Sequence, residues 1–253
     1  MCFGVFTMIK YFECDSNGRK IRGLCHEYSS NAPIVAIVHG FFSANKIGPY
    51  RLFFEIAQSL SNVGFNVLRF DLSAMGESDG NIYNISFSDH VCDLINVIDQ
   101  LKCIYSQNKI SLLAHCGGSS VVISYAKDYF DNIDKMTLIS PFLPCKESLG
   151  KLFDDNMLID LKFKGYTYRK GIYFHSSFLE GLYNLWSDFT NISCEFPIDV
   201  IYGDNDEFVS AERYRFWTEK NRLNNSMICN ADHNYLNRLA RNELLKLVNS
   251  IYI

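Results

Sequence analysis

Apolar runs alternate with segments of helical periodicity along most of the chain. Three runs are continuous and rich in β-branched residues: "IVAIVHG" (34–40), "FNVLRFD" (65–71) and "KISLLAH" (109–115). Such runs are typical of strands that are buried on both faces. Segments 50–64 and 89–102 place apolar residues three or four positions apart, which predicts amphipathic helices. The pattern therefore predicts an α/β domain with a mostly parallel central sheet and helices on both faces.

The alternation extends toward both ends of the chain. Segments 8–14 and 21–28 flank the turn "DSNGRK" and predict an N-terminal hairpin. The other predicted elements are helices over 117–130, 211–223 and 235–251 and strands over 135–140, 198–203 and 226–229.

One segment, 145–190, interrupts this rhythm. It is rich in aromatic residues and glycine, as in "FKGYTYRKGIYFHSSFLEGLYNLW". We interpret it as a lid inserted after the sixth strand of the sheet. The remaining residues, 1–144 and 191–253, then form one core domain, which the length of 253 residues allows.

Composition excludes several classes of function. The net charge is −4 and the basic residues are scattered, which argues against a nucleic-acid or anionic-membrane surface. The one cationic group, "KFKGYTYRK" at 162–170, is interpreted as a solvated loop. The sequence has neither a run of about 18 apolar residues nor a signal peptide, so we expect a cytoplasmic protein without a membrane span.

The nine cysteines point to free thiols in a reducing compartment. Their number is odd, and neither CxxC pairs nor zinc-type Cys/His spacings occur. We therefore expect no metal and no disulfide framework. Five of them are expected to fill the core as small apolar residues, namely Cys14, Cys25, Cys92, Cys103 and Cys229.

Cys116 differs because it follows a buried strand and precedes a helix, in "AHCGG" (114–118). Ligands of parallel sheets bind at the carboxyl ends of the strands. A sharp turn there needs small neighbours, and Ala114 and Gly118 meet that need. Cys116 is thus a candidate nucleophile. A buried structural thiol is the alternative.

The turn resembles the nucleophile elbow of the α/β-hydrolase family, G-x-S-x-G, with cysteine in place of serine and alanine in place of the first glycine. Four further motifs follow the family's order: "HGFF" (39–42), "FDLSAMGESDG" (70–80), "YGDNDEFV" (202–209) and "NADHNYL" (230–236). The resemblance covers roughly 8–144 and 195–253. It is strongest to a cysteine variant of the cinnamoyl (feruloyl) esterase and small-acyl esterase branch.

The resemblance implies a role for each matched residue. Cys116 would be the nucleophile, His233 the base and Asp206 the acid that orients it, with Asp204 as the competing acid. The backbone N–H groups of Phe41 and Gly117 would stabilise the oxyanion. The candidate pocket residues are Phe42, His115, Cys145 and His175, although His115, like His39, is more often a structural residue in such loops. This chemistry needs neither a cofactor nor a metal.

Three functions are compatible with these residues. The first is an esterase or thioesterase that forms a thioester acyl-enzyme on cysteine. The second is an acyltransferase or cyclase, in which an amine, hydroxyl or thiol replaces water. The third is a non-catalytic binding protein that retains the fold. The expected partner is a small-molecule or carrier-bound acyl substrate, whose identity the sequence does not reveal, and oligomeric state stays open.

Overall fold

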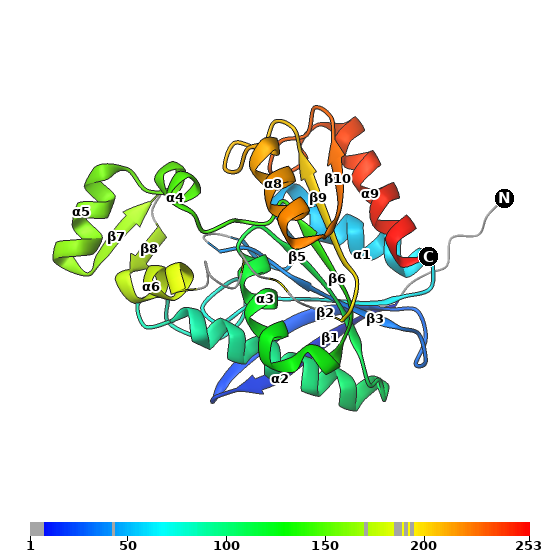
Figure 1. Ribbon diagram of the computed structural model, residues 1–253. Coiled ribbons are helices and arrows are strands. Elements are labelled where there is room, and N and C mark those ends of the chain that lie inside the picture. Colours follow the sequence, from blue (N-terminus) through cyan, green and yellow to red (C-terminus); the bar gives the residue numbers. More distant parts are fainter. Residues whose placement is uncertain (1–7, 42–43, 170–171, 185–188, 190–191, 193–194) are drawn as a thin grey trace.

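The computed structural model describes residues 8–41, 44–169, 172–184, 189, 192 and 195–253. Its centre is a twisted sheet with helices on both faces (Figure 1). The strands of this sheet are β1 (Met8–Ser16), β2 (Arg19–Glu27), β3 (Ile34–Val38), β4 (Asn66–Phe70), β5 (Ile110–His115), β6 (Ile133–Ile139), β9 (Ile198–Gly203) and β10 (Asn224–Ile228).

The strand order is β1-β2-β4-β3-β5-β6-β9-β10. Only β1 and β2 run antiparallel to their neighbours, as the N-terminal hairpin predicts. From β4 to β10 all pairings are parallel. The sequence prediction of an α/β-hydrolase sheet is therefore confirmed. Parallel pairing also brings the carboxyl ends of β3, β5, β6 and β9 to one edge of the sheet.

Helices cover this sheet in two layers. They are α1 (Leu52–Asn62), α2 (Phe87–Tyr105), α3 (Gly118–Tyr129), α8 (Ala211–Asn221) and α9 (Arg238–Tyr252). Along β3, Val35 and Ile37 pack with α1 and α9, whereas Ile34, Ala36 and Val38 pack with the layer of α2, α3 and α8. Because both faces of β3 pack against helices, its sequence is one continuous apolar run.

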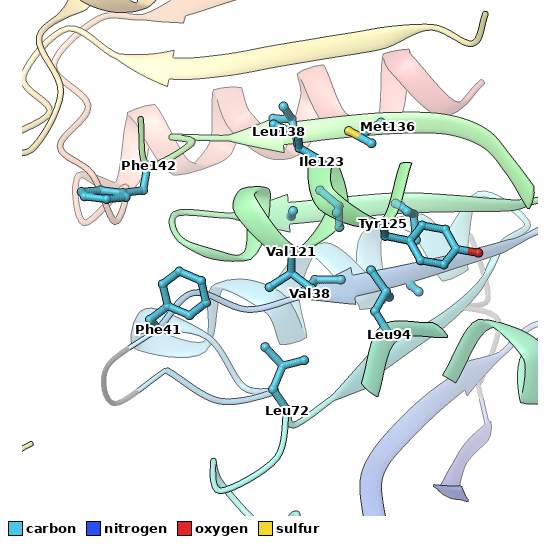
Figure 2. Packing of buried hydrophobic residues seen from close by; sticks show 14 of the residues in the cluster. Val38, Phe41, Leu72, Leu94, Val121, Ile123, Tyr125, Met136, Leu138 and Phe142 are labelled. Atoms are coloured by element: carbon cyan, nitrogen blue, oxygen red, sulfur yellow. The ribbon is translucent and has the colours of Figure 1, made fainter. Parts of the chain in front are cut away.

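Figure 2 shows the second of these layers from close by. Leu94 of α2 and Val121 of α3 point toward Val38 and Leu138 on the strands, and all four side chains are fully buried. Burying such side chains contributes about 1.5–3 kcal/mol each. The layer thus fixes α3, and with it the turn at the start of that helix.

A second group of elements follows β6 and precedes β9 in the sequence. It projects to one side of the sheet (Figure 1). It consists of α4 (Lys146–Leu152), α5 (Asp155–Lys164), the antiparallel pair β7 (Tyr166–Arg169) and β8 (Ile172–His175), and α6 (Ser176–Asn184). We call residues 145–190 the inserted segment.

Two predicted elements differ from the structure. Residues 162–170 were expected to form a loop, but they contain the end of α5 and all of β7, because Gly165 (φ 79°) ends the helix. The last helix begins at Arg238 rather than at 235. Tyr235 has a φ of 54°, and the Asn237 side chain accepts hydrogen bonds from the next backbone amides.

In the described part of the chain, no helix combines the length and the apolar character that crossing a membrane requires.

Candidate active site

Cys116 lies in the turn between β5 and α3, at the carboxyl edge of the sheet. Its φ is 53°, in the left-handed region that non-glycine residues rarely occupy. The turn is held by backbone hydrogen bonds: the Cys116 amide donates to Ile139 O (3.1 Å), and its carbonyl accepts from Ser119 and Phe142. Such strain persists only where the surroundings enforce it, and it is frequent at functional sites.

Glycines on both sides allow this turn to pack against the end of β3. A Cβ on Gly118 would lie 2.4 Å from Val38 O, and one on Gly40 would lie 3.0 Å from the Cβ of Cys116. A side chain at Gly118 would clash with the backbone, and one at Gly40 would be tightly confined. A small residue is therefore required at Gly118 because the start of α3 is in close contact with the backbone at the end of β3.

His233, in the loop between β10 and α9, is 3% exposed and lines the same cavity as Cys116. Its Nδ1 lies 2.8 Å from Asp206 Oδ2 and donates to it. Its Nε2 is buried and has no hydrogen-bond partner in the structure. This nitrogen is therefore free to exchange a proton with a group in the cavity.

The charge of His233 is set by its neighbours. Burial alone would lower its pKa, but the Cys116 sulfur and the Asp206 carboxylate raise the pKa of His233 well above its usual range. For Asp206, burial opposes the charged form, while bonds from His233 and two backbone amides hold its pKa below the usual value. The site therefore favours the imidazolium form of His233 beside an ionised Asp206.

Asp206 is fixed by four donors. Its Oδ1 accepts from the amides of Phe208 (2.9 Å) and Val209 (3.1 Å), and its Oδ2 is 3.0 Å from the Tyr214 hydroxyl as well as near His233. The competing acid, Asp204, instead accepts from the amide of Ala231 at 3.3 Å. The structure thus places Asp206, and not Asp204, against the histidine.

Two residues that support His233 were not assigned this role from the sequence. Tyr214 of α8 is fully buried and contacts Asp206. His115 donates through Nε2 to the backbone carbonyl of His233 at 3.0 Å. Burial, with the nearby His233 charge, lowers the pKa of His115 to about 3, so it stays neutral at pH 7. It lines the cavity, but its ring positions the histidine loop.

Phe41 and Gly117, the residues that carry the two candidate oxyanion donors, lie in neighbouring loops. A Cβ on Gly40 would be 3.4 Å from the Gly117 nitrogen, so the loop after β3 runs along the start of α3. A Cβ on Gly117 would lie 2.2 Å from the Phe41 ring, which explains the first glycine of "CGG". Phe41 packs in turn on Phe178 of α6, with ring centroids 4.9 Å apart.

Two other polar groups hold this edge of the sheet together. His39 donates to Gly40 O and accepts from the amide of Leu72, which links the loops after β3 and β4. Asp71 accepts from the backbone and the ammonium of Lys46, both at 2.6 Å. These residues support the loops and take no part in contacts with Cys116.

The cavity above Cys116 has a volume of about 450 Å³. Its described lining consists of Gly40, Phe41, Ala44, Asn45, Gly48, Pro49, His115, Cys116, Leu152, Arg169, Ile172, Phe174, Phe208, His233 and Asn234. Of the predicted pocket residues, His115 is present. Cys145 instead begins α4 beside Ser148, and His175 is bonded to Ser177, so neither lines the cavity. Phe42 lies outside the described residues.

The expectation that five cysteines fill the core is right for two of them. Cys14 and Cys25 are buried, and burial raises the pKa of Cys14 to about 12. Cys92 is only half-buried, and Cys103 on α2 and Cys229 in the turn after β10 are exposed. Among the described residues, no cluster of three or more His, Cys, Asp or Glu side chains is arranged to hold a metal ion.

The chain matches a known family over half of its length. The model of the family described as "Serine aminopeptidase, S33" matches residues 29–164. A lysophosphatidylserine lipase of Xenopus tropicalis, ABHD12, is 24% identical over 136 residues, which are 53% of this chain and 34% of that protein. The match thus spans about a third of the length of this curated relative.

Solved structures show the same fold. Est1E from Butyrivibrio proteoclasticus, with ferulic acid bound, has a TM-score of 0.81 at 19% identity, over 95% of this chain and 97% of that one. A thioesterase domain from the curacin biosynthetic pathway has a TM-score of 0.70 at 16% identity, over 95% of this chain and 99% of that one. At such identities the likeness concerns the fold alone.

Proposed function

Since the chain belongs to the serine aminopeptidase family of α/β hydrolases, we propose that it hydrolyses acyl esters or thioesters with Cys116 as nucleophile. One observation carries the proposal. The strained turn presents Cys116 to a cavity that also contains His233, whose imidazole is fixed by Asp206 at 2.8 Å. Nucleophile, base and orienting acid are the three parts that such acyl transfer requires.

In the first half of the proposed reaction, the Cys116 thiolate attacks the carbonyl carbon and a C–S bond forms. Negative charge moves onto the carbonyl oxygen, where the N–H groups of Gly117 and Phe41 would stabilise it. The tetrahedral intermediate then expels the alkoxide or thiolate leaving group. His233, with its raised pKa, supplies the proton that this group takes up.

In the second half, water attacks the thioester carbonyl. His233 accepts a proton from the water, the C–S bond breaks, and the carboxylic acid leaves with Cys116 regenerated as thiolate. The same intermediate also reacts with amines and thiols. Whether water is the acceptor is therefore part of the test.

The proposal is tested by steady-state hydrolysis of p-nitrophenyl esters and S-phenyl thioesters. We expect Cys116→Ala to lower kcat on the order of 10⁴-fold or more, as removal of a nucleophile does in related mechanisms. Cys116→Ser should retain a reduced esterase activity, because His233 must then deprotonate a far weaker acid. Cys103→Ala removes an exposed thiol and is the matched control, with activity unchanged.

Turnover by Cys116→Ala at the wild-type rate would contradict the proposal. The products distinguish hydrolysis from transfer. Wild-type protein is incubated with an acyl thioester plus candidate amines, and mass spectrometry identifies the products. Free acid as the sole product supports hydrolysis. An amide whose formation depends on Cys116 would instead show that the protein is an acyltransferase.

A further inference from the structure

We propose that Arg169 binds an anionic group of the substrate, so that the preferred substrates are acyl compounds carrying a carboxylate or a phosphate. This inference deepens the proposed function and rests on it. Arg169 is the last residue of β7, in the inserted segment (Figure 1), and it lines the same cavity as Cys116 and His233. Apart from His233, it is the cationic residue of the described cavity lining.

The charge of Arg169 has no counter-ion in the described part of the chain. The described cavity lining contains neither aspartate nor glutamate, and no carboxylate among the described residues pairs with Arg169. Two other cations of the inserted segment are paired, Lys164 with Asp160 at 2.8 Å and Lys151 with Glu147 at 3.4 Å, and Lys162 lies over the Phe163 ring outside the cavity. A half-buried guanidinium without a partner is costly, and a bound anion would remove that cost.

Neighbours of Arg169 define the rest of the substrate. Leu152, Ile172 and Phe174 line the cavity on the side of the inserted segment, and Phe41 and Phe208 line it near the turn. These side chains offer an apolar surface to a hydrocarbon or aromatic body. The substrate we infer is therefore amphiphilic, with an apolar part, a reactive carbonyl at Cys116 and an anion at Arg169.

Arginine suits this task better than lysine. Its planar guanidinium presents two parallel N–H groups that match both oxygens of a carboxylate or a phosphate. Its place on a two-stranded hairpin, where Arg169 pairs with Ile172, fixes the backbone from which it reaches. The same geometry accepts either anion, so the two must be compared experimentally.

The test measures binding to Cys116→Ala protein, which cannot turn substrate over, by isothermal titration calorimetry. The probes are S-phenyl thioesters with a six-carbon acyl chain that ends in a carboxylate, in its methyl ester or in a phosphate. A fourth probe, the hexanoyl thioester of 4-mercaptobenzoate, carries the anion on the leaving group. We expect at least one anionic probe to bind about tenfold more tightly than the methyl ester.

Arg169→Met should abolish this preference and leave the affinity for the methyl ester within about twofold, since only a charge-assisted hydrogen bond is lost. Arg169→Lys should retain part of the preference. Lys164→Met, which removes a cation from an exposed ion pair outside the cavity, is the matched control and should change neither affinity.

Equal affinity for all probes, or equal weakening of all by Arg169→Met, would overturn the inference. The two proposals fail separately. Anion binding through Arg169 without any Cys116-dependent turnover contradicts the catalytic role and leaves the anion site intact. Cys116-dependent turnover without an anion preference supports the catalytic role of Cys116 and contradicts the anion site at Arg169.

Discussion

The sheet edge and the inserted segment differ in how far their charged side chains are buried and paired. At the sheet edge, buried charged groups are paired: Asp71 with Lys46, and Asp206 with His233. In the inserted segment, large side chains remain at the surface, with Phe163 76% and Tyr168 50% exposed, and Arg169 is unpaired among the described residues.

This contrast separates two tasks. A closely packed edge whose charged groups are paired holds the atoms of a reaction at fixed positions, which is what nucleophilic catalysis requires. The inserted segment has few such constraints and forms one wall of the cavity. We infer that the edge determines which reaction occurs and that the inserted segment determines which substrate enters it. Three predictions test this division.

The largest expected effect concerns the two aspartates at the end of β9. Asp206→Asn replaces the acceptor of His233 Nδ1 by a group that can donate, so the imidazole loses its tautomer and its orientation. We expect kcat to fall on the order of 10³–10⁴-fold, with stability little changed. Asp204→Asn is the control, because its oxygen still accepts from Ala231, and its kcat should stay within a few-fold. Equal losses in both variants would remove the distinction.

A smaller effect is expected from alanine at two glycines. At Gly118, on the sheet edge, the new methyl would lie 2.4 Å from Val38 O, so Gly118→Ala should lower the free energy of unfolding by about 1–3 kcal/mol. At Gly150, in α4, an added Cβ would meet no described atom within 4 Å beyond its chain neighbours and its own helix backbone. Gly150→Ala should therefore raise the free energy of unfolding by roughly 0.5–1 kcal/mol. Urea denaturation measures both. A destabilised Gly150→Ala together with a tolerated Gly118→Ala would reverse the comparison.

The smallest effect is a pH dependence of stability caused by buried neutral histidines. Burial, with Arg69, lowers the pKa of His26 to about 4, and burial lowers the pKa of His90 to about 4. Both bind protons more readily when unfolded, where their pKa is about 6.5. The contribution of these two histidines to the free energy of unfolding is therefore fully present above pH 6.5 and is lost as the pH decreases toward 4.

His26→Gln isolates one contribution to this pH dependence. His26 Nε2 accepts from the Arg69 guanidinium, and the glutamine oxygen can replace that acceptor without titrating. Urea midpoints at pH 7.5, 6.0 and 5.0 should fall less steeply in this variant, by up to about 1 kcal/mol per pH unit. His175→Gln, at a half-buried histidine of the inserted segment, is the control. Identical profiles for wild type and His26→Gln would refute this explanation.

Most of the fold was predictable because the sheet strands are buried on both faces. β3, β4 and β5 are buried at every position and mostly apolar, and this pattern can be recognised without knowing which strands pair with them. β7 and β8 were missed, because four-residue strands with exposed aromatic side chains carry no usable periodicity. Local turn chemistry decided other boundaries, as with the side-chain cap of Asn237 on α9.

The site was predictable where a motif fixes its residues and unpredictable where only the fold brings them together. Cys116, Asp206 and His233 each stand in a short motif; the structure brings Cys116 and His233 to one cavity and Asp206 to the Nδ1 of His233. The support from His115 goes to a backbone carbonyl 118 positions away, which no side-chain pattern records. Arg169 had no signal beyond its charge, since its position depends on the conformation of the inserted segment.

The most direct test of the account is the mass of the protein during reaction. Wild-type protein is mixed with a p-nitrophenyl ester or an S-phenyl thioester, quenched in acid within the first turnovers, and examined by intact-mass and peptide mass spectrometry. The account predicts one added acyl group, located on the peptide that contains Cys116 and absent from Cys116→Ala. An acyl group on another residue, or turnover without any adduct in protein that hydrolyses these substrates, would contradict it.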